Sequence, residues 1–323
     1  MKIIENKKKI DKMIKNASNI FVVGHRHLDL DAIASNIGMV EYIKSFNKKP
    51  IIIINDKVKE AGVAKILDKT GKDYHFEKSS KIKHRINKDS LLIITDTNKC
   101  PLLQDSTLPA LFQNIIIIDH HEHNETSISN ALVVVDDKLS SASEMVTYLL
   151  EEGNVKINKD VATTLLSGIV LDTNNFALKT TEETFYAAYL LSKYGASVNK
   201  VQSLLKQNIK EYIERTKVLI NLKVVDKVAI TVAKASIIYR REDLAKIADL
   251  LLQFNGIEAS IVVGKIESNR IGVSGRSIGN LNIGDVLEYL GGGGNAYEGA
   301  AQTTGKKIKE VEEELFEILK KFK

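Results

Sequence analysis

Five strand-length runs of isoleucine, leucine and valine, with helix-patterned segments between them, constrain the fold of the first half of this chain. The runs cover residues 20–23, 51–54, 91–95, 115–118 and 132–135, and the helical segments lie near 32–45, 60–68 and 143–152. Strands that are apolar throughout are buried on both faces, as in parallel sheets whose crossover helices cover both sides. The first half therefore predicts an α/β domain built on a parallel sheet.

Polar side chains that can bind metal ions gather where these apolar segments end. The groups are GHRHLDLD at 24–31 after the first run, Asp96 after the third, Asp119, His120 and His121 after the fourth, and Asp172 at the end of the apolar segment TLLSGIVL. A single aspartate in such a place often only caps the next helix. Ligands of open parallel sheets bind beyond the carboxyl ends of the strands, so four such groups favour one shared site.

These groups supply carboxylates and imidazoles but no thiolates. The candidate residues are His25, Asp29, Asp31, Asp96, His120, His121 and Asp172. Clustered carboxylates repel one another, and this donor set suits Mn²⁺ or a similar divalent ion better than a structural zinc. Four carboxylates exceed what one ion needs, whereas two ions sharing a carboxylate would activate water for phosphoryl displacement. Such chemistry needs no serine or cysteine nucleophile, and we interpret Cys100 as structural.

The sequence pattern changes after residue 160. Helical segments follow, including a capping box predicted at Thr180 and Glu183 and one long amphipathic helix over 197–222. Strands are predicted again around 228–234, 258–265 and 270–277. We therefore expect a metal-binding catalytic domain over 1–210, a connecting helix end over 211–224 and a smaller α/β substrate-binding domain over 225–323. The active site is expected in the cleft between the two domains.

The second domain contains residues suited to binding an anion. Arg276 in the stretch SGRS can hold a phosphate through two parallel hydrogen bonds, and Ser274 adds a hydroxyl. The glycine run at 291–294 would let the backbone approach a ligand and direct amides toward it. The same run is also compatible with an ordinary loop.

Composition excludes several classes of protein. Hydrophobic residues make up 44% of the 323, so a disordered chain is excluded, and no apolar run reaches the length of a membrane span. The lysine-rich start lacks the apolar core of a signal peptide, and a single cysteine suits a reducing cytoplasm. The net charge of +5 fits either a small anionic ligand or an ordinary solvated surface.

The motifs, taken in order, resemble those of the DHH phosphoesterase family. G-H-x-x-x-D-x-D at 24–31, D-T at 96–97, D-H-H at 119–121 and D-T at 172–173 resemble its four metal motifs. GVSGRSIGNLNIGDVLEYLGGGG resembles the DHH-associated C-terminal domain, so the resemblance covers nearly the whole chain. Within the family, GHRHLDLDAIAS and GIVLDTNNFALKTTEETFYAA are most similar to the catalytic region of bacterial cyclic-di-AMP phosphodiesterases. Membrane-anchored members have further segments before this region, so we expect a stand-alone form or a catalytic fragment.

The resemblance implies a role for each candidate residue. One Mn²⁺ would be held by His25, Asp29 and Asp96, and the other by Asp31, Asp96, His120 and Asp172. Asp96, which bridges the ions, and His121, a hydrogen-bond donor at the scissile phosphate, would be the catalytic residues. Substrate would be bound by Arg276, Ser274, Gly292, Gly293, Gly294 and Asn295. Asn295 stands where the family usually has a histidine, which leaves the preferred substrate open.

The activity implied is Mn²⁺-dependent hydrolysis of cyclic di-AMP to linear pApA, which would make the protein a phosphoric diester hydrolase. Related enzymes cleave pApA or very short RNA, or dephosphorylate 3′-phosphoadenosine 5′-phosphate, and these activities are alternatives. A nucleotide-binding sensor without catalysis is another alternative. The expected partner is a cyclic dinucleotide or a short linear adenine dinucleotide, with no long nucleic acid and no membrane. A homodimer and a cytoplasmic location complete these expectations.

Overall fold

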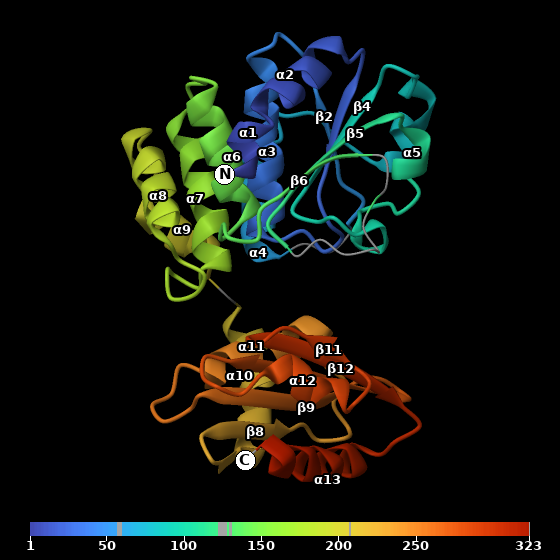
Figure 1. Ribbon diagram of the computed structural model, residues 1–323, viewed down its shortest axis with the longest axis vertical. Helices are drawn as coiled ribbons and strands as arrows, with labels where there is room; N and C mark the ends of the chain where they lie inside the picture. Colours follow the sequence, from blue (N-terminus) through green and yellow to red (C-terminus); the bar gives the residue numbers. More distant parts are fainter. Residues whose placement is uncertain (57–59, 122–127, 129–130, 207, 323) are drawn as a thin grey trace. The chain divides into compact units, whose positions relative to one another are not determined.

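The computed structural model describes residues 1–56, 60–121, 128, 131–206 and 208–322. The chain forms two compact units, Met1–Lys206 and Gln207–Lys323, each with its own six-stranded sheet (Figure 1). Within the described ranges, every helix is too short or too polar to span a bilayer.

The sheet of the first unit is parallel throughout and has the strand order β3-β2-β1-β4-β5-β6. Its strands are β1 (Ile20–Val23), β2 (Ile51–Ile53), β3 (Phe76–Glu77), β4 (Leu91–Thr95), β5 (Asn114–Asp119) and β6 (Leu132–Val135). The predicted parallel α/β sheet is confirmed. The strand order reverses between β1 and β4, and ligands of open α/β sheets bind at such a point, beyond the carboxyl ends of the strands.

Helices cover the first sheet. They are α1 (Lys2–Glu5), α2 (Lys7–Asn16), α3 (Leu30–Lys44), α4 (Ala61–Thr70), α5 (Ser79–Ile82), α6 (Ala142–Glu152), α7 (Lys159–Asp172), α8 (Glu182–Lys193) and α9 (Val198–Leu204). Short 3₁₀ turns lie at Lys83–Arg85, Cys100–Leu102 and Pro109–Leu111. Helices α3, α4 and α6 confirm the three helical segments predicted near 32–45, 60–68 and 143–152.

Two local predictions about helices were wrong. The single helix over 197–222 is interrupted, because α9 ends at Leu204 and the Asn208 side chain accepts a hydrogen bond from Lys210 N at the start of a new helix. The capping box lies one residue later than predicted, with Thr181 and Thr184 bonding each other's backbone N–H groups. Adjacent threonines make both registers readable in the sequence, and the fold selects the second.

Successive residues of a strand pack into two separate hydrophobic cores, one on each face of the sheet. Val22, Ile93 and Ile116 point into the core under α3, α6 and α7, whereas their neighbours Phe21 and Leu92 point into the core on the opposite face. Strand side chains alternate between the faces of a sheet, so a strand covered on both sides must be apolar throughout. This explains the unbroken isoleucine and leucine runs.

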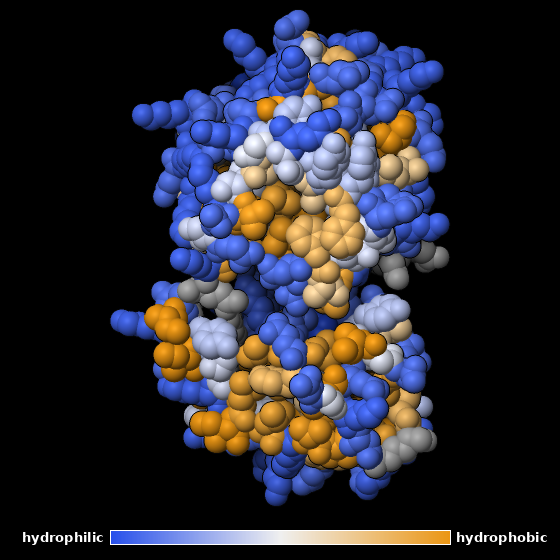
Figure 2. All heavy atoms as spheres, turned by 90° about the vertical axis from the view of Figure 1, so that its left-hand side faces the viewer, coloured by the Kyte–Doolittle hydropathy of each residue, from blue (hydrophilic) through white to orange (hydrophobic). Residues whose placement is uncertain are grey.

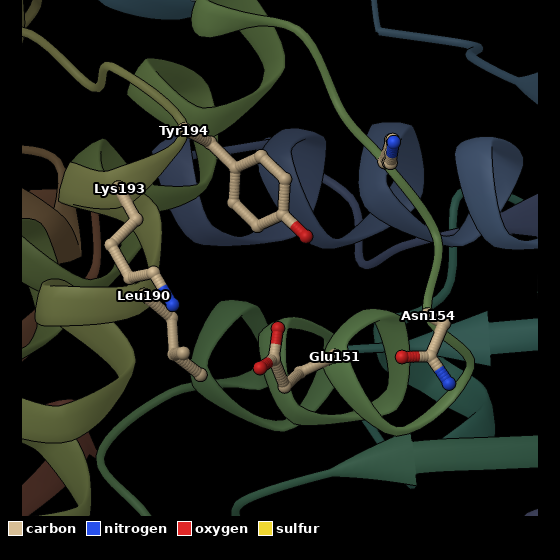
Figure 3. Close-up of a pocket in the computed structure, with 6 residues that line it drawn as sticks. Glu151, Asn154, Leu190, Lys193 and Tyr194 are labelled. Carbon is tan, nitrogen blue, oxygen red and sulfur yellow. The ribbon is translucent and has the colours of Figure 1, made fainter.

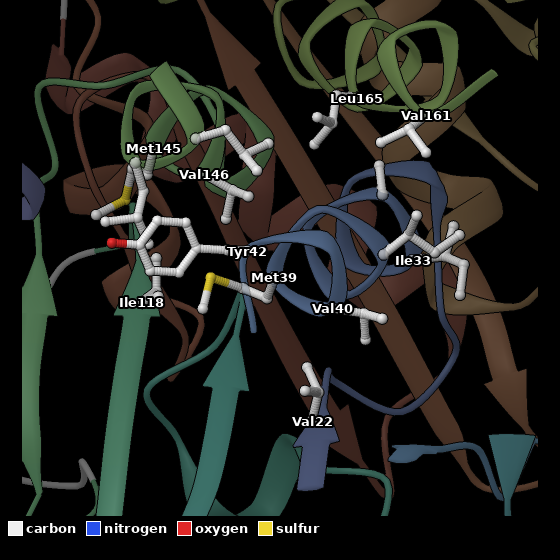
Figure 4. Packing of buried hydrophobic residues seen from close by; sticks show 14 of the residues in the cluster. Val22, Ile33, Met39, Val40, Tyr42, Ile118, Met145, Val146, Val161 and Leu165 are labelled. Atoms are coloured by element: carbon white, nitrogen blue, oxygen red, sulfur yellow. The ribbon is translucent and has the colours of Figure 1, made fainter. Parts of the chain in front are cut away.

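Helix α3 is buried along most of its length between the sheet and helices α6 and α7 (Figure 4). Close approach is allowed by Gly38, where a Cβ would lie 2.6 Å from Val146 Cγ1 and 2.9 Å from Leu165 Cδ2. The loop that carries Asp29 leads directly into α3. The packing of α3 therefore also fixes the end of this loop.

Aromatic rings join α8 to the segments beside it. The face turned to the viewer in Figure 2 shows apolar side chains of the first unit gathered among hydrophilic ones, and α8 lies on this side in Figure 1. Phe185 of α8 stacks on Phe176 with ring centroids 5.6 Å apart, and Tyr186 stacks on Tyr148 of α6 at 6.2 Å. These contacts hold α8 against α6 and against the loop that follows α7.

The second unit has a mixed sheet of order β11-β12-β10-β9-β8-β7, in which only β8 and β9 are parallel neighbours. Its elements are α10 (Ile209–Thr216), the 3₁₀ turn Lys217–Asn221, β7 (Lys223–Val225), β8 (Val228–Val232), α11 (Arg241–Leu251), β9 (Ala259–Glu267), β10 (Arg270–Ser277), α12 (Ile283–Glu288), β11 (Gly293–Gly294), β12 (Glu298–Thr304) and α13 (Ile308–Leu319). Helices α12 and α13 pack on one face of the sheet and α11 on the other. A smaller second α/β unit is therefore confirmed.

We predict that Leu165→Ala lowers the free energy of unfolding of the first unit by about 2–5 kcal/mol, because it leaves a cavity where α7 packs on α3. Leu165 is fully buried. The matched control is Leu111→Ala, whose leucine is 43% exposed, and it should change stability by no more than about 0.5 kcal/mol. Urea denaturation followed by circular dichroism measures both values. Equal losses in the two variants would contradict this packing.

Candidate metal centre

The loop after β1 places two aspartates at the start of α3. Asp29 is the N-cap residue, and its Oδ1 accepts hydrogen bonds from Asp31 N at 3.0 Å and Ala32 N at 2.9 Å. Its other oxygen, Oδ2, lies 3.5 Å from His25 Nε2. Asp29 thus caps α3 with Oδ1 and faces the cluster with Oδ2.

All seven candidate residues of the first unit come together at the carboxyl edge of the sheet. Three sets have ligand atoms within 4.8 Å of one another: His25, Asp29 and Asp96; Asp31, Asp96, His120 and Asp172; and Asp96, Asp119, His120 and His121. Asp96 belongs to every set. The convergence predicted from the strand ends is therefore present.

The two carboxylate oxygens of Asp96 face different histidines. Oδ2 lies 3.3 Å from His25 Nε2, and Oδ1 lies 3.4 Å from His120 Nε2. The backbone of Asp96 has a φ of 60°, a strained value outside glycine, and Asp96 N is held by a 3.0 Å hydrogen bond to Ile118 O. The Asp96 carboxylate thus faces the His25 set with one oxygen and the His120 set with the other.

The two histidines present the nitrogen needed for metal binding. His25 Nδ1 lies 2.8 Å from the carbonyl oxygen of Arg26, which can only accept, so Nδ1 carries the proton and Nε2 is left facing Asp29 and Asp96. His120 is buried, and its Nε2 lies 3.1 Å from Asp172 Oδ2. Both rings therefore direct Nε2 at carboxylates of the cluster.

Asp31 is fully buried and is held by the N-terminus of α6. Its Oδ2 accepts from Ala142 N at 2.8 Å and its Oδ1 from Ser143 N at 2.9 Å. A helix N-terminus favours a negative charge. Gly168 of α7 leaves room for this contact, since a Cβ there would lie 2.7 Å from Asp31 Oδ1 and 2.2 Å from Ser143 Oγ.

Asp172 is the last residue of helix α7, and its equivalence to the strand ends was a wrong prediction. The preceding segment lies where the sequence pattern predicts helices, and ten successive residues of it are buried in α7. The following residues Asn174, Asn175 and Phe176 all have positive φ values of 46°, 59° and 63°. This left-handed turn redirects the chain immediately after the Asp172 carboxylate.

Asp119 has a role that the sequence reasoning did not assign. It is fully buried, and its Oδ1 lies 2.8 Å from His121 Nδ1 while accepting a 2.9 Å hydrogen bond from His120 N. A carboxylate in this place favours the His121 tautomer with its proton on Nδ1. His121 is half-exposed, so its other ring nitrogen remains accessible. The first letter of the D-H-H motif was the available signal.

Electrostatics show an excess of negative charge at the centre. Burial raises the pKa of Asp31 well above its ordinary value, and the carboxylates of Asp96 and Asp172 raise it further. Burial also raises the pKa of Asp172, against the opposing effect of His120. Burial alone would lower the pKa of His120, but Asp172 and Asp96 hold it well above the ordinary value. The raised pKa values of Asp31, Asp172 and His120 all reflect carboxylates held close together away from water.

The residues present fit divalent ions. Within the described part of the chain, the buried atoms without a hydrogen-bond partner include Asp96 Oδ1, Asp119 Oδ2, His120 Nδ1 and His120 Nε2. Buried polar atoms normally have partners, and the two that face each other, Asp96 Oδ1 and His120 Nε2 at 3.4 Å, are explained by an ion that both would coordinate. Oxygen and imidazole donors without thiolate suit Mn²⁺ and similar ions.

The predicted substrate residues of the second unit gather on adjacent strands. Ser274 on β10 is in register with Ala300 on β12, which is in register with Gly293 on β11. Arg276 Nε lies 2.7 Å from Asp249 Oδ1, and its Nη1 donates to the carbonyl oxygen of Gly275 at 2.9 Å. Ser274, Arg276 and the glycine run are thus brought together by sheet pairing alone.

The second half of the glycine run, Gly293–Gly294, pairs with β12 as a short strand. A Cβ at Gly292 would lie 2.2 Å from Ala300 O, and one at Gly294 would lie 2.2 Å from Glu298 O, whereas Gly293 faces open space. Asn295 follows, and its Oδ1 accepts hydrogen bonds from Tyr297 N at 2.8 Å and Glu298 N at 3.0 Å. Asn295 therefore closes the turn into β12, a function not foreseen from the sequence.

A cavity of about 300 Å³ lies elsewhere in the first unit (Figure 3). It is lined by Glu151, Asn154, Lys156, Leu190, Lys193 and Tyr194. These residues lie at the C-terminal ends of α6 and α8, whereas Asp31 contacts the N-terminus of α6. The cavity contains none of the candidate site residues and is not the metal centre.

Comparisons with known proteins agree with this geometry. The DHH family, N-terminal domain, matches residues 19–169, and the DHHA1 domain matches residues 226–323. The protein named cyclic-di-AMP phosphodiesterase GdpP of Geobacillus thermodenitrificans is 33% identical over 316 residues, which are 95% of this chain and 48% of that protein. The chain thus spans about half the length of this relative.

Two further comparisons concern a relative that matches part of the chain and a solved structure with a similar fold. A probable bifunctional oligoribonuclease and PAP phosphatase NrnA of Streptococcus mutans is 32% identical over 179 residues, covering 54% of this chain and 52% of that protein. The solved structure of an exopolyphosphatase-related protein from Bacteroides fragilis has a TM-score of 0.82 at 20% identity, covering 98% of this chain and 96% of the other. The latter likeness supports the fold.

We predict that Asp96→Asn weakens each step of Mn²⁺ binding by more than about 100-fold, since this one carboxylate belongs to every candidate set. Isothermal titration with MnCl₂ measures the two binding steps. Asp136→Asn is the control, because Asp136 is buried after β6 but lies outside the three sets. A loss confined to one step would contradict the shared position of Asp96.

Proposed function

This chain carries the N-terminal domain of the DHH family followed by a DHHA1 domain, and we propose that it hydrolyses cyclic di-AMP to linear pApA with the help of two Mn²⁺ ions. The observation that supports this proposal is the Asp96 carboxylate, whose two oxygens face His25 and His120 separately. One ion would be held by His25, Asp29 and Asp96, and the other by Asp31, Asp96, His120 and Asp172. Bound ions of this kind supply a water of lowered pKa and neutralise phosphate charge.

The chain's own residues would orient the phosphodiester for attack. His121, oriented by Asp119, would donate a hydrogen bond to a non-bridging oxygen of the scissile phosphate. Water would add to phosphorus, the bond from phosphorus to the 3′ oxygen would break, and the leaving oxygen would receive the proton. The product retains a 5′ phosphate and is a linear dinucleotide.

The second unit would contribute phosphate contacts through Arg276, Ser274 and the backbone of Gly292, Gly293 and Gly294. Asn295 cannot become cationic, so its contribution to a phosphate is limited to its amide N–H groups. Its Oδ1 already accepts two backbone hydrogen bonds in the turn. We therefore assign Asn295 a weaker substrate contact than a histidine would make.

Hydrolysis of short linear RNA or of 3′-phosphoadenosine 5′-phosphate is the second candidate activity. It is supported by the likeness to the Streptococcus mutans relative, which covers 54% of this chain. Cyclic di-AMP is favoured because the likeness to the Geobacillus thermodenitrificans relative extends over 95% of the chain, including the second unit.

Product analysis tests the proposal directly. The protein is incubated with Mn²⁺ and separately with cyclic di-AMP, pApA and a four-nucleotide RNA, and a parallel set contains a chelator. We expect pApA from cyclic di-AMP as the fastest reaction and no product with the chelator. Faster cleavage of pApA or RNA would select the second candidate activity. Tight nucleotide binding without turnover in any divalent metal would instead identify a sensor.

We predict that Arg276→Ala raises the KM for cyclic di-AMP roughly tenfold and changes kcat much less, because a phosphate clamp acts mainly in binding. Arg270→Ala is the matched control, since Arg270 lies on the same strand and pairs with Glu267 at its end. Steady-state kinetics measure both constants. An Arg276 variant with unchanged KM would remove Arg276 from the substrate contacts.

A further inference from the structure

Glu144 is a fully buried carboxylate on α6 that belongs to none of the three candidate metal sets. Burial raises its pKa. The segment from Ser141 to Glu144 has the spacing of a capping box, and Ser141 Oγ does accept a hydrogen bond from Glu144 N at 3.0 Å. The Glu144 side chain, however, bonds other groups, and these groups connect it to the metal centre.

A single oxygen of Glu144 joins two helix starts. Its Oε2 accepts hydrogen bonds from Ser140 N at 2.9 Å, from Ser140 Oγ, and from Thr184 Oγ1 of α8 at 3.0 Å. Its Oε1 is buried without a hydrogen-bond partner in the described part of the chain. Three bonds to one oxygen hold the turn before α6 and the first turn of α8 together.

The first of these helix starts contacts Asp31. Ser140 and Ser141 precede the amides of Ala142 and Ser143, and those amides hold the two oxygens of Asp31. Fixing Ser140 therefore fixes the direction in which the N-terminus of α6 presents its N–H groups. Outer partners of metal ligands orient them and raise affinity, and their loss typically weakens binding by about 10–100-fold.

The second helix start ends the loop that follows Asp172. Thr184 bonds Thr181 at the start of α8, and Phe185 of the same turn stacks on Phe176 in that loop. Tyr148 of α6 adds a hydrogen bond to Glu183 O at 2.7 Å. Asp31 and Asp172 belong to the same candidate set, so both connections from Glu144 lead to one ion.

We propose that Glu144 is a positioning residue for the ion held by Asp31, His120 and Asp172, and that it acts by accepting hydrogen bonds from Ser140 and Thr184. The inference rests on the proposed two-ion site. It leaves the ion held by His25 and Asp29 largely unaffected, because the hydrogen bonds described for Glu144 lead toward Asp31 and Asp172, and neither of these carboxylates belongs to that set.

Titration with Mn²⁺ alone tests this inference. The free ion is followed by electron paramagnetic resonance and the heat by calorimetry, and the variant Asp172→Asn identifies which step belongs to the second ion. We expect Glu144→Ala to weaken that step by about 10–100-fold and to leave the other step unchanged. Glu144→Gln keeps a carbonyl oxygen for the three bonds and should restore binding to near the wild-type value.

Two further variants separate positioning from folding. Thr147→Val removes a buried hydroxyl of the same helix that donates to Ser143 O and does not contact Glu144 among the hydrogen bonds of the described residues, and it should leave both steps unchanged. Thr184→Val removes one donor to Glu144 and the hydroxyl that accepts from Thr181 N, while every residue of α6 is kept, and it should weaken the same step to a smaller extent. If Glu144→Ala fails to fold, Thr184→Val and Glu144→Gln decide the question by the same criteria.

The outcomes that overturn the inference are distinct from those that overturn the proposed function. Equal weakening of both steps, no change in either step, or a Glu144→Gln variant as weak as Glu144→Ala would each refute the positioning role. A wild-type protein that binds a single Mn²⁺ would instead contradict the two-ion site itself.

Discussion

The first unit holds four carboxylates close together at one edge of its parallel sheet, although they repel one another. The rest of its structure depends on this constraint. Asp29 and Asp31 lie at the start of α3, which follows β1. Asp96 follows β4, and Asp172 ends α7. Each is held by groups that favour a negative charge, such as the amides at the start of α6 around Asp31. These groups offset part of the repulsion between the carboxylates, and divalent cations would neutralise the remaining negative charge. The apolar strands and α3 serve as the rigid frame that keeps the carboxylates from moving apart.

Five strands of the first unit were predictable because they contain runs of apolar residues that pack into the cores on both faces of the sheet. Strands without a run of apolar side chains were not predicted. β3 has two residues, which is too short for any periodicity, and β11 consists of Gly293 and Gly294, which have no side chains to form a pattern. The interruption between α9 and α10 depends on the capping of Lys210 N by Asn208, a local competition that amphipathic spacing does not express.

The site was predictable to the extent that its residues follow strands. His25, Asp96 and His120 were identified by that position, and the structure brings them together. Roles that depend on tertiary contacts were not readable. Glu144 lies in an ordinary capping-box pattern, and its bond to Thr184 crosses from α6 to α8. Asp119 has the same chemistry as the other candidate aspartates, and only its contact with the His121 ring distinguishes it.

The turn closed by Asn295 makes the shape of the hairpin tip depend on one small side chain. Its Oδ1 accepts two backbone N–H groups, whereas a neutral imidazole offers a single acceptor nitrogen. A histidine at this position could therefore hold at most one of the two amides, and the tip between β11 and β12 would depend on solvent for the other.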